Sequence, residues 1–221
     1  MERALVVGAS GGIGGALAAE LAARGAAVTA LSRREHGLDL TDEASVARII
    51  GGLEGAFDTL IVATGALDMD GRGPEKSLRA VDPAALAAQF ALNATGPLLV
   101  LKHALRLMPR DRASRFAALS ARVGSIGDNA LGGWYGYRAA KAALNQLIHT
   151  AAIEVARTHP QAVVVALHPG TVDTGLTRPH RGSHAAMPPA EAAGHLLAVL
   201  HGLAPQATGG FYDWQGKPVP W

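Results

Sequence analysis

A tyrosine and a lysine stand four residues apart in the second half of the chain, at Tyr137 and Lys141. Residues at this spacing in a helix lie on one face, so the two side chains can share one piece of chemistry. A free phenol has a pKa of about 10, and a neighbouring ammonium lowers it by favouring the phenolate. The pair predicts a tuned general acid that gives its proton to a developing alkoxide. The alternative is ordinary helix surface, although only one of the three tyrosines has this lysine partner.

Three glycines follow the first apolar run of the chain, at Gly8, Gly12 and Gly14. They lie between a predicted strand and a predicted helix, where backbone must approach a pyrophosphate and a Cβ would obstruct it. Their spacing differs from the G-x-G-x-x-G of the usual dinucleotide fingerprint. The turn predicts a phosphate site, with close helix packing as the alternative.

The residues after the second predicted strand, Ser32, Arg33 and Arg34, include no acid. An acid there would accept a hydrogen bond from a ribose hydroxyl, whereas arginine pairs with a phosphate. We therefore expect NADP(H) to be preferred over NAD(H), with Arg33 as the first partner of the extra phosphate and Arg34 as the second. Solvated surface arginines are the alternative.

Short β-rich runs alternate with longer helical stretches, which is typical of parallel β-α-β units. Helix starts are indicated by an oxygen cap at Thr41 and by Asp82 before a proline, and a helix end by Gly25. The Gly96-Pro97 pair must kink or divide its helix. Strands are expected at 4–7, 27–31, 59–63, 115–120, 162–167 and 210–213, with a further short one before Asp39. The pattern predicts one α/β domain over residues 1–221, a doubly wound parallel sheet of about seven strands with helices on both faces.

The composition argues against several classes of function. Lys and Arg number 20 against 18 Asp and Glu, with no long run of one sign, so we expect no nucleic-acid partner. No cysteine is present and the nine histidines have no ligand-like spacing, so neither a disulfide framework nor a metal site is expected; a cytoplasmic location fits. We also expect no signal peptide and no membrane span, because Arg, Glu, Gly or Pro interrupts every long apolar stretch.

The G-x-x-x-G-x-G spacing of the first turn and the Tyr-x-x-x-Lys pair resemble the short-chain dehydrogenase/reductase family, along essentially the whole chain. Residues 124–138 and the tail 209–213 are similar to its compact, C-factor-like branch. The resemblance implies a Rossmann-type fold, hydride transfer to a small-molecule carbonyl, and a homodimer or homotetramer. It implies a cofactor site formed by Gly8, Ser10, Gly12, Ile13, Gly14, Ser32, Arg33, Arg34, Asp39, Leu40, Ala63, Gly65, Tyr137, Lys141, Pro169, Gly170, Val172 and Thr174.

Two further catalytic positions are less certain from the residues alone. Asn93 resembles the family's asparagine that holds a water in the proton relay to the lysine, while a helix cap before the Gly-Pro break is an equal alternative. Ala121 stands where the family has the serine that polarises the carbonyl. Ser125 is the suggested substitute, with a turn residue as an equal alternative. Without a replacement hydroxyl, we expect a slow enzyme, by about 10²-fold or more.

The segment at 174–189 is rich in Gly, Pro, Arg and His and predicts a substrate loop. Its Arg178, His180, Arg181 and His184 suit an anionic or polar substrate, although an ordinary exposed loop is favoured. Two functions follow from these observations. The first is an NADP(H)-dependent carbonyl reductase with Tyr137 as the acid. The second is a dinucleotide-binding signalling or regulatory protein with little turnover, suggested by Ala121 and the C-factor-like resemblance.

Overall fold

The computed structural model describes residues 1–69, 71–182 and 185–221, and its centre is a six-stranded parallel sheet. The strand order is β2-β1-β3-β4-β5-β6, so the chain reverses direction across the sheet between β1 and β3. The strands are β1 Arg3–Val7, β2 Ala27–Leu31, β3 Thr59–Val62, β4 Ser114–Leu119, β5 Ala162–His168 and β6 Phe211–Asp213. Ligands of such open sheets bind at the carboxyl ends of the strands beside this reversal.

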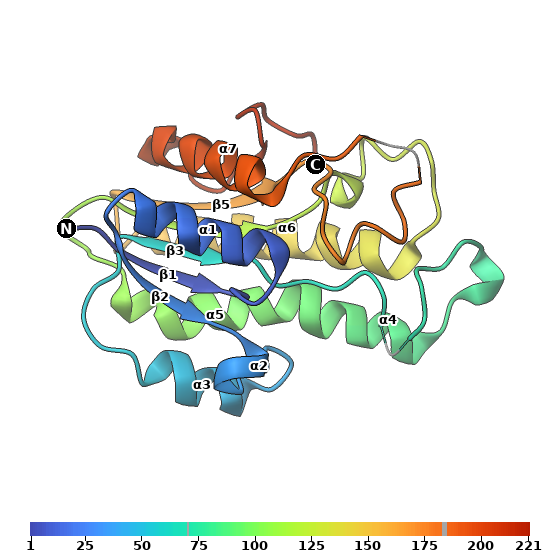
Figure 1. Cartoon of the computed structure of the whole chain (residues 1–221), viewed down its shortest axis with the longest axis horizontal. Coiled ribbons are helices and arrows are strands. Elements are labelled where there is room, and N and C mark those ends of the chain that lie inside the picture. The colour runs from blue at the N-terminus through green and yellow to red at the C-terminus, as the bar shows by residue number, and fades with distance from the viewer. Residues whose placement is uncertain (70, 183–184) are drawn as a thin grey trace.

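Helices cover both faces of the sheet, as expected (Figure 1). Leucines of α1 and α7 pack on one face, and apolar side chains of α3, α5 and α6 pack on the other. The helices are α1 Gly12–Ala23, α2 Arg33–His36, α3 Glu43–Gly51, α4 Pro83–Phe90, α5 Gly96–Ala104, α6 Tyr135–Ala156 and α7 Pro189–Gly202. The strands are rich in Val, Ala and Leu because both of their faces are buried. The single-domain Rossmann-type fold is therefore confirmed.

The predicted seventh strand, before Asp39, is wrong. Ser32 caps the short helix α2 by accepting a hydrogen bond from Glu35 N, and Gly37 ends that helix with a φ of 67°. The N–H of Asp39 is then taken by the hydroxyl of Ser45, at 3.1 Å, and not by a neighbouring strand. Local side-chain bonds thus compete with sheet pairing at this edge.

The signals for helix ends were mostly right. Asp82 accepts a hydrogen bond from Ala85 N at 2.8 Å and Gly25 adopts a left-handed φ of 88°. The cap of α3 is Asp42, however, and not Thr41, which hydrogen-bonds to Asp39. Before the Gly-Pro pair the helix widens into a π-helical segment, Ala91–Thr95, and α5 begins at Gly96.

The helical run Pro83–Leu107 is long and apolar enough to cross a membrane, with a mean hydropathy of 1.5 over its 18-residue window. The expected interruption of every long apolar stretch does not hold here, since the Gly-Pro pair widens the helix without ending it. In the fold the run packs against α3 and α6, and it places Ala94, Val100 and Leu101 in the core.

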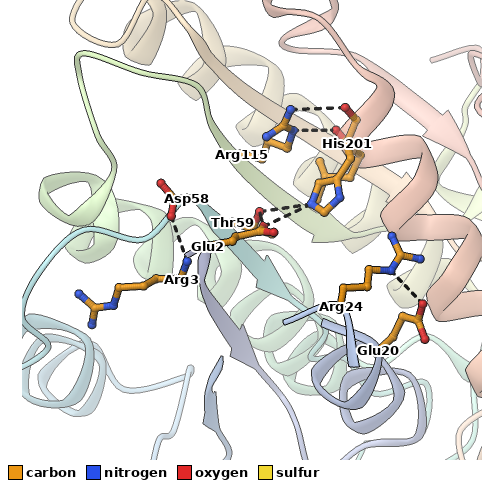
Figure 2. A network of polar contacts seen from close by, with 9 residues as sticks. Glu2, Arg3, Glu20, Arg24, Asp58, Thr59, Arg115 and His201 are labelled. Carbon is orange, nitrogen blue, oxygen red and sulfur yellow. Dashed lines mark hydrogen bonds and ion pairs between the residues drawn. The ribbon is translucent and has the colours of Figure 1, made fainter. Parts of the chain in front are cut away.

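A polar network joins the amino-terminal ends of the strands to the helices on one face (Figure 2). Thr59 donates to Glu2 Oε1 at 2.6 Å, and His201 Nε2 lies 3.4 Å from the same oxygen. The guanidinium of Arg115 donates to the carbonyl of Leu200 at 3.1 Å. These contacts hold the end of α7 against β1, β3 and β4, at the edge of the sheet opposite the candidate site.

Candidate active site

A cavity of about 940 Å³ lies at the carboxyl ends of β1, β3, β4 and β5. Four segments that follow these strands line it, at 10–13, 63–65, 120–123 and 168–172. Three residues of α6, part of the 174–181 loop, and residues on either side of these segments, among them Leu67 and Trp134, also line it. The cavity therefore occupies the place where an open parallel sheet binds its ligand.

The opening glycines build the turn between β1 and α1. A Cβ on Gly14 would lie 2.2 Å from the carbonyl oxygen of Gly8, and one on Gly8 would lie 2.9 Å from the carbonyl carbon of Ala63. Close packing thus explains these two positions. Ser10, Gly12 and Ile13 line the cavity, and no side chain caps the start of α1. Uncapped N–H groups with no acid in the first turn suit an anion.

Tyr137 and Lys141 come together on the cavity wall, as predicted, from the first turns of α6. Both are buried, with exposed fractions of 8% and 2%. Lys141 Nζ lies 5.7 Å from the centre of the Tyr137 ring and donates to the carbonyl of Leu119 at 2.8 Å. This hydrogen bond joins α6 to the end of β4 and holds Lys141 in place beside Tyr137.

The expected lowering of the phenol pKa is wrong for this arrangement. Burial raises the pKa of Tyr137 to about 12, and burial lowers the pKa of Lys141 to about 7. Both shifts have one cause, because a site with little water disfavours the charged form of each group. Tyr137 is consequently a phenol that holds its proton at neutral pH, which suits an acid and not a phenolate base.

Asn93 is fully buried in the π-helical segment. Its side chain donates to the carbonyl of Ala66 at 2.9 Å and accepts from the N–H of Ala66 at 3.2 Å. The helix-cap alternative is therefore wrong. A Cβ on Gly65 would lie 3.0 Å from Asn93 Oδ1 and 3.6 Å from Lys141 Nζ, so both side chains lie close to Gly65.

No side-chain hydroxyl occupies the Ala121 position, which lines the cavity. Ser120 donates to Asn145 Oδ1 on α6 at 2.6 Å. Ser125 is buried and accepts from Asp128 N at 3.1 Å, as a turn residue does. Ser125 is absent from the cavity lining among the described residues, so the structure does not bring it to the other catalytic candidates.

The structure places the remaining predicted cofactor residues in two groups. Ala63, Gly65, Pro169, Gly170, Val172 and Thr174 line the cavity beside Tyr137 and Lys141. The second group lies around α2, outside that lining: Ser32, Arg33, Arg34, Asp39 and Leu40. Arg33 and Arg34 are exposed, and Arg34 lies 3.6 Å from Glu35. Asp39 accepts from Thr41, which lowers the pKa of that carboxyl.

The predicted substrate loop contributes His180 and Arg181 to the lining. Arg178 is instead exposed and pairs with Asp173 at 2.8 Å, and Arg181 lies 3.3 Å from the same carboxylate. His184 lies outside the described residues.

Among the lining residues that received no role from the sequence are Thr64, Trp134 and His168. Thr64 Oγ1 is buried without a hydrogen-bond partner among the described residues. The scarcity of tryptophan, with three in the chain, was a usable signal for Trp134 because it stands three residues before Tyr137. Nothing local marks Thr64 or His168, since their importance comes from the strands that the fold places side by side.

The donors in the cavity fit a dinucleotide. The uncapped start of α1 suits its phosphates, the unpartnered hydroxyl of Thr64 suits a polar ligand, and Lys141 offers an ammonium. No Asp or Glu occurs among the described lining residues, so no carboxylate of the lining repels the phosphates of a dinucleotide.

Comparison with known proteins gives a consistent result. The sequence model of short-chain dehydrogenases matches residues 36–184. The C-signal protein of Myxococcus xanthus is 37% identical over 142 residues, which cover 64% of this chain and 81% of that protein. A short-chain dehydrogenase/reductase from Burkholderia multivorans with bound NADP has a TM-score of 0.80 at 27% identity, covering 100% and 99% of the two chains. A carbonyl reductase from Pseudomonas aeruginosa PAO1 has a TM-score of 0.79 at 26% identity, covering 100% of both.

Proposed function

This chain belongs to the short-chain dehydrogenase family, in its C-factor-like branch, and on that premise we propose that it reduces an aldehyde or ketone to an alcohol with NADPH. One observation carries the proposal: a buried phenol and a buried ammonium from α6 face the same cavity as the uncapped start of α1. Such a cavity can hold a dinucleotide and a carbonyl compound together. The similar proteins named carbonyl reductase and NADP-bound reductase support it.

The residues divide the reaction between them. The bound dinucleotide supplies a hydride to the carbonyl carbon. Tyr137 donates the proton of its hydroxyl to the developing alkoxide oxygen, so that the carbonyl gains one hydride and one proton. Lys141 would hold a ribose hydroxyl of the dinucleotide, and its hydrogen bond to the carbonyl of Leu119 orients α6 against the end of β4. Asn93 fixes the Ala66 backbone beside Lys141 and maintains the route by which Tyr137 regains its proton.

Removing the phenol tests this assignment. Tyr137→Phe keeps the ring and its packing but removes the proton, so we expect kcat to fall by about 10²-fold or more. The dissociation constant of NADPH should stay within a few-fold, since the ring and Lys141 remain. Steady-state oxidation of NADPH with a panel of aldehydes and ketones measures the first, and fluorescence titration measures the second. A Tyr137→Phe protein as active as the parent would sink the proposal.

The preference for NADPH has its own test. Arg33 and Arg34 are exposed at the start of α2, where a guanidinium can pair with the 2′-phosphate; Arg34 already lies 3.6 Å from Glu35, so Arg33 is the first choice. We expect Arg33→Ala to weaken NADPH binding about tenfold and to leave NADH binding nearly unchanged. Arg48→Ala, on α3, is a control for the loss of one exposed arginine. NADH that binds the parent as tightly as NADPH would remove the preference.

A second function has a specific observation behind it. Ala121 leaves the candidate site without the hydroxyl that polarises the carbonyl in the resembling family, which favours a dinucleotide-binding regulatory protein with little turnover. That protein would bind NADPH tightly and would not oxidise it with any carbonyl compound.

We also propose that the protein, whether reductase or regulator, is a homo-oligomer in the cytoplasm. Size-exclusion chromatography with light scattering tests the oligomeric state.

A further inference from the structure

Trp134 has an unusual backbone for a bulky residue. Its φ is 52°, and among the described residues it is the only non-glycine residue with a positive φ. It follows Gly132 and Gly133, whose φ angles are 65° and 66°. An aromatic side chain is rare in this left-handed region and persists where its surroundings hold it there, often at a functional site.

The backbone contacts that hold Trp134 in place come from two sides. Its N–H donates to the carbonyl of Glu75 at 2.5 Å, and its carbonyl accepts from Arg138 N at 2.9 Å in the first turn of α6. The carboxylate of Glu75 accepts from Gly136 N at 3.1 Å. The loop around Glu75 and the start of α6 thus clamp the residue that carries the indole.

The indole lies between the proposed acid and the substrate loop. Its centre is 6.4 Å from that of Tyr137, with an interplanar angle of 72°, and 6.0 Å from that of His180, at 76°. His180 Nε2 in turn lies 2.8 Å from Asp68 Oδ1, in the segment that follows β3. Trp134 therefore packs against both Tyr137, the proposed acid, and His180 of the substrate loop, and His180 in turn lies beside Asp68.

The lining of the cavity that holds the indole is mostly apolar. Leu67, Leu131 and Leu176 line the cavity with it, and Leu131 is 93% exposed. The three arginines of the described lining have partners: Arg122 pairs with Asp128 at 2.6 Å, Arg181 lies 3.3 Å from Asp173, and Arg138 donates to the carbonyls of Gly133 and Val123. The described lining thus offers apolar surface to a substrate, and its arginines already have partners within the protein.

We propose that Trp134 determines substrate specificity and that the preferred substrate is an uncharged carbonyl compound bearing a flat or cyclic apolar group packed on the indole. The inference rests on the proposed function. A carbonyl oxygen that accepts from Tyr137 Oη sits within about 2.8 Å of it, and its substituent then lies in the same part of the cavity as the indole, whose centre is 6.4 Å from the centre of the Tyr137 ring. Ring pairs prefer centre distances of about 4.5–7 Å. His180 and Asp68 act as positioning residues for the indole.

Two substitutions at this position test the proposal. Trp134→Asn removes the ring but tolerates the left-handed backbone, and Trp134→Phe keeps a ring. We expect Trp134→Asn to lower kcat/KM for acetophenone and cyclohexyl methyl ketone by about tenfold or more, with less than about threefold change for butanone. Trp134→Phe should stay within about threefold of the parent on all three. Trp221→Phe, which replaces a half-exposed tryptophan packed on Phe211 and His149, is the matched control.

Equal losses on all three ketones, or none, would overturn the role of Trp134 and leave the reductase proposal standing. If the parent reduces no carbonyl compound, the proposed function fails instead, and binding decides the inference. Saturation-transfer NMR with acetophenone and NADPH then gives the answer: a signal in the parent and in Trp134→Phe that is lost in Trp134→Asn supports the role of the indole. An unchanged signal, or no signal in the parent, contradicts it.

Discussion

Ala121 is the residue at which this chain departs most from the resembling family, which has a serine that polarises the carbonyl at this position. It lines the cavity at the end of β4, and no described serine hydroxyl takes its place, because Ser120 bonds to Asn145 and Ser125 to the Asp128 backbone. A donor aimed at a developing oxyanion contributes about 10²–10³-fold to kcat in a dry site. A reductase that lacks it depends on Tyr137 alone to stabilise the alkoxide.

Restoring a hydroxyl at this position should speed the reaction. We expect Ala121→Ser to raise kcat for a reducible ketone by about tenfold, since one added donor recovers part of the missing stabilisation. The dissociation constant of NADPH should not change. Steady-state kinetics measure the first quantity and titration the second.

Ala139→Ser is the matched control for Ala121→Ser, because Ala139 is exposed on α6 and outside the described lining. An unchanged or lower kcat in the Ala121→Ser protein, with NADPH still bound, would mean that another group already polarises the carbonyl. The same result would weaken the explanation of slow turnover.

What the sequence could predict at individual positions depends on how local the cause is. Tyr137 and Lys141 were predictable because their meeting needs only one helical turn. Their pKa shifts were not, because burial comes from β4 and from the cavity wall, which no local pattern encodes. Trp134 was missed for the same reason, since its contacts reach His180 in a distant loop.

Among the elements, hydrophobic periodicity and capping residues predicted the helices and strands that local interactions determine. The strands and α1, α4 and α6 were predicted because apolar spacing and Asp82 act within a few residues. The strand before Asp39 failed because Ser45, six residues along, takes the N–H that pairing would need. The glycine turn was located correctly, but the structure also assigns Gly8 and Gly14 to packing within the turn, which sequence spacing could not separate from phosphate binding.

Three histidines lie in places where the fold opposes their charge: His159 is buried, and His168 and His201 are half-buried. Burial lowers the pKa of His168 to about 4, and burial is also the main cause that lowers the pKa of His159 and of His201. His201 belongs to the polar network at the amino-terminal ends of the strands, where Glu2 partly offsets the shift (Figure 2). The His168 ring is therefore neutral in the folded protein near pH 6, and burial disfavours the charged form of the other two rings.

Acid should destabilise the protein well before its carboxylates titrate. A histidine whose folded pKa lies below its unfolded value of 6.5 binds fewer protons when folded, so the free energy of unfolding falls as pH drops below 6.5. The loss from His168 continues to about pH 4, where the folded ring also protonates, and amounts to at most about 3 kcal/mol.

Urea unfolding at pH 7.5, 6, 5 and 4.5 measures this loss of stability, and His168→Gln should flatten the decline. His36→Gln, at an exposed ring of α2, should leave the decline unchanged. A parent protein equally stable at pH 7.5 and 4.5 would contradict a neutral, buried His168, because protonation of the unfolded chain alone forces the loss.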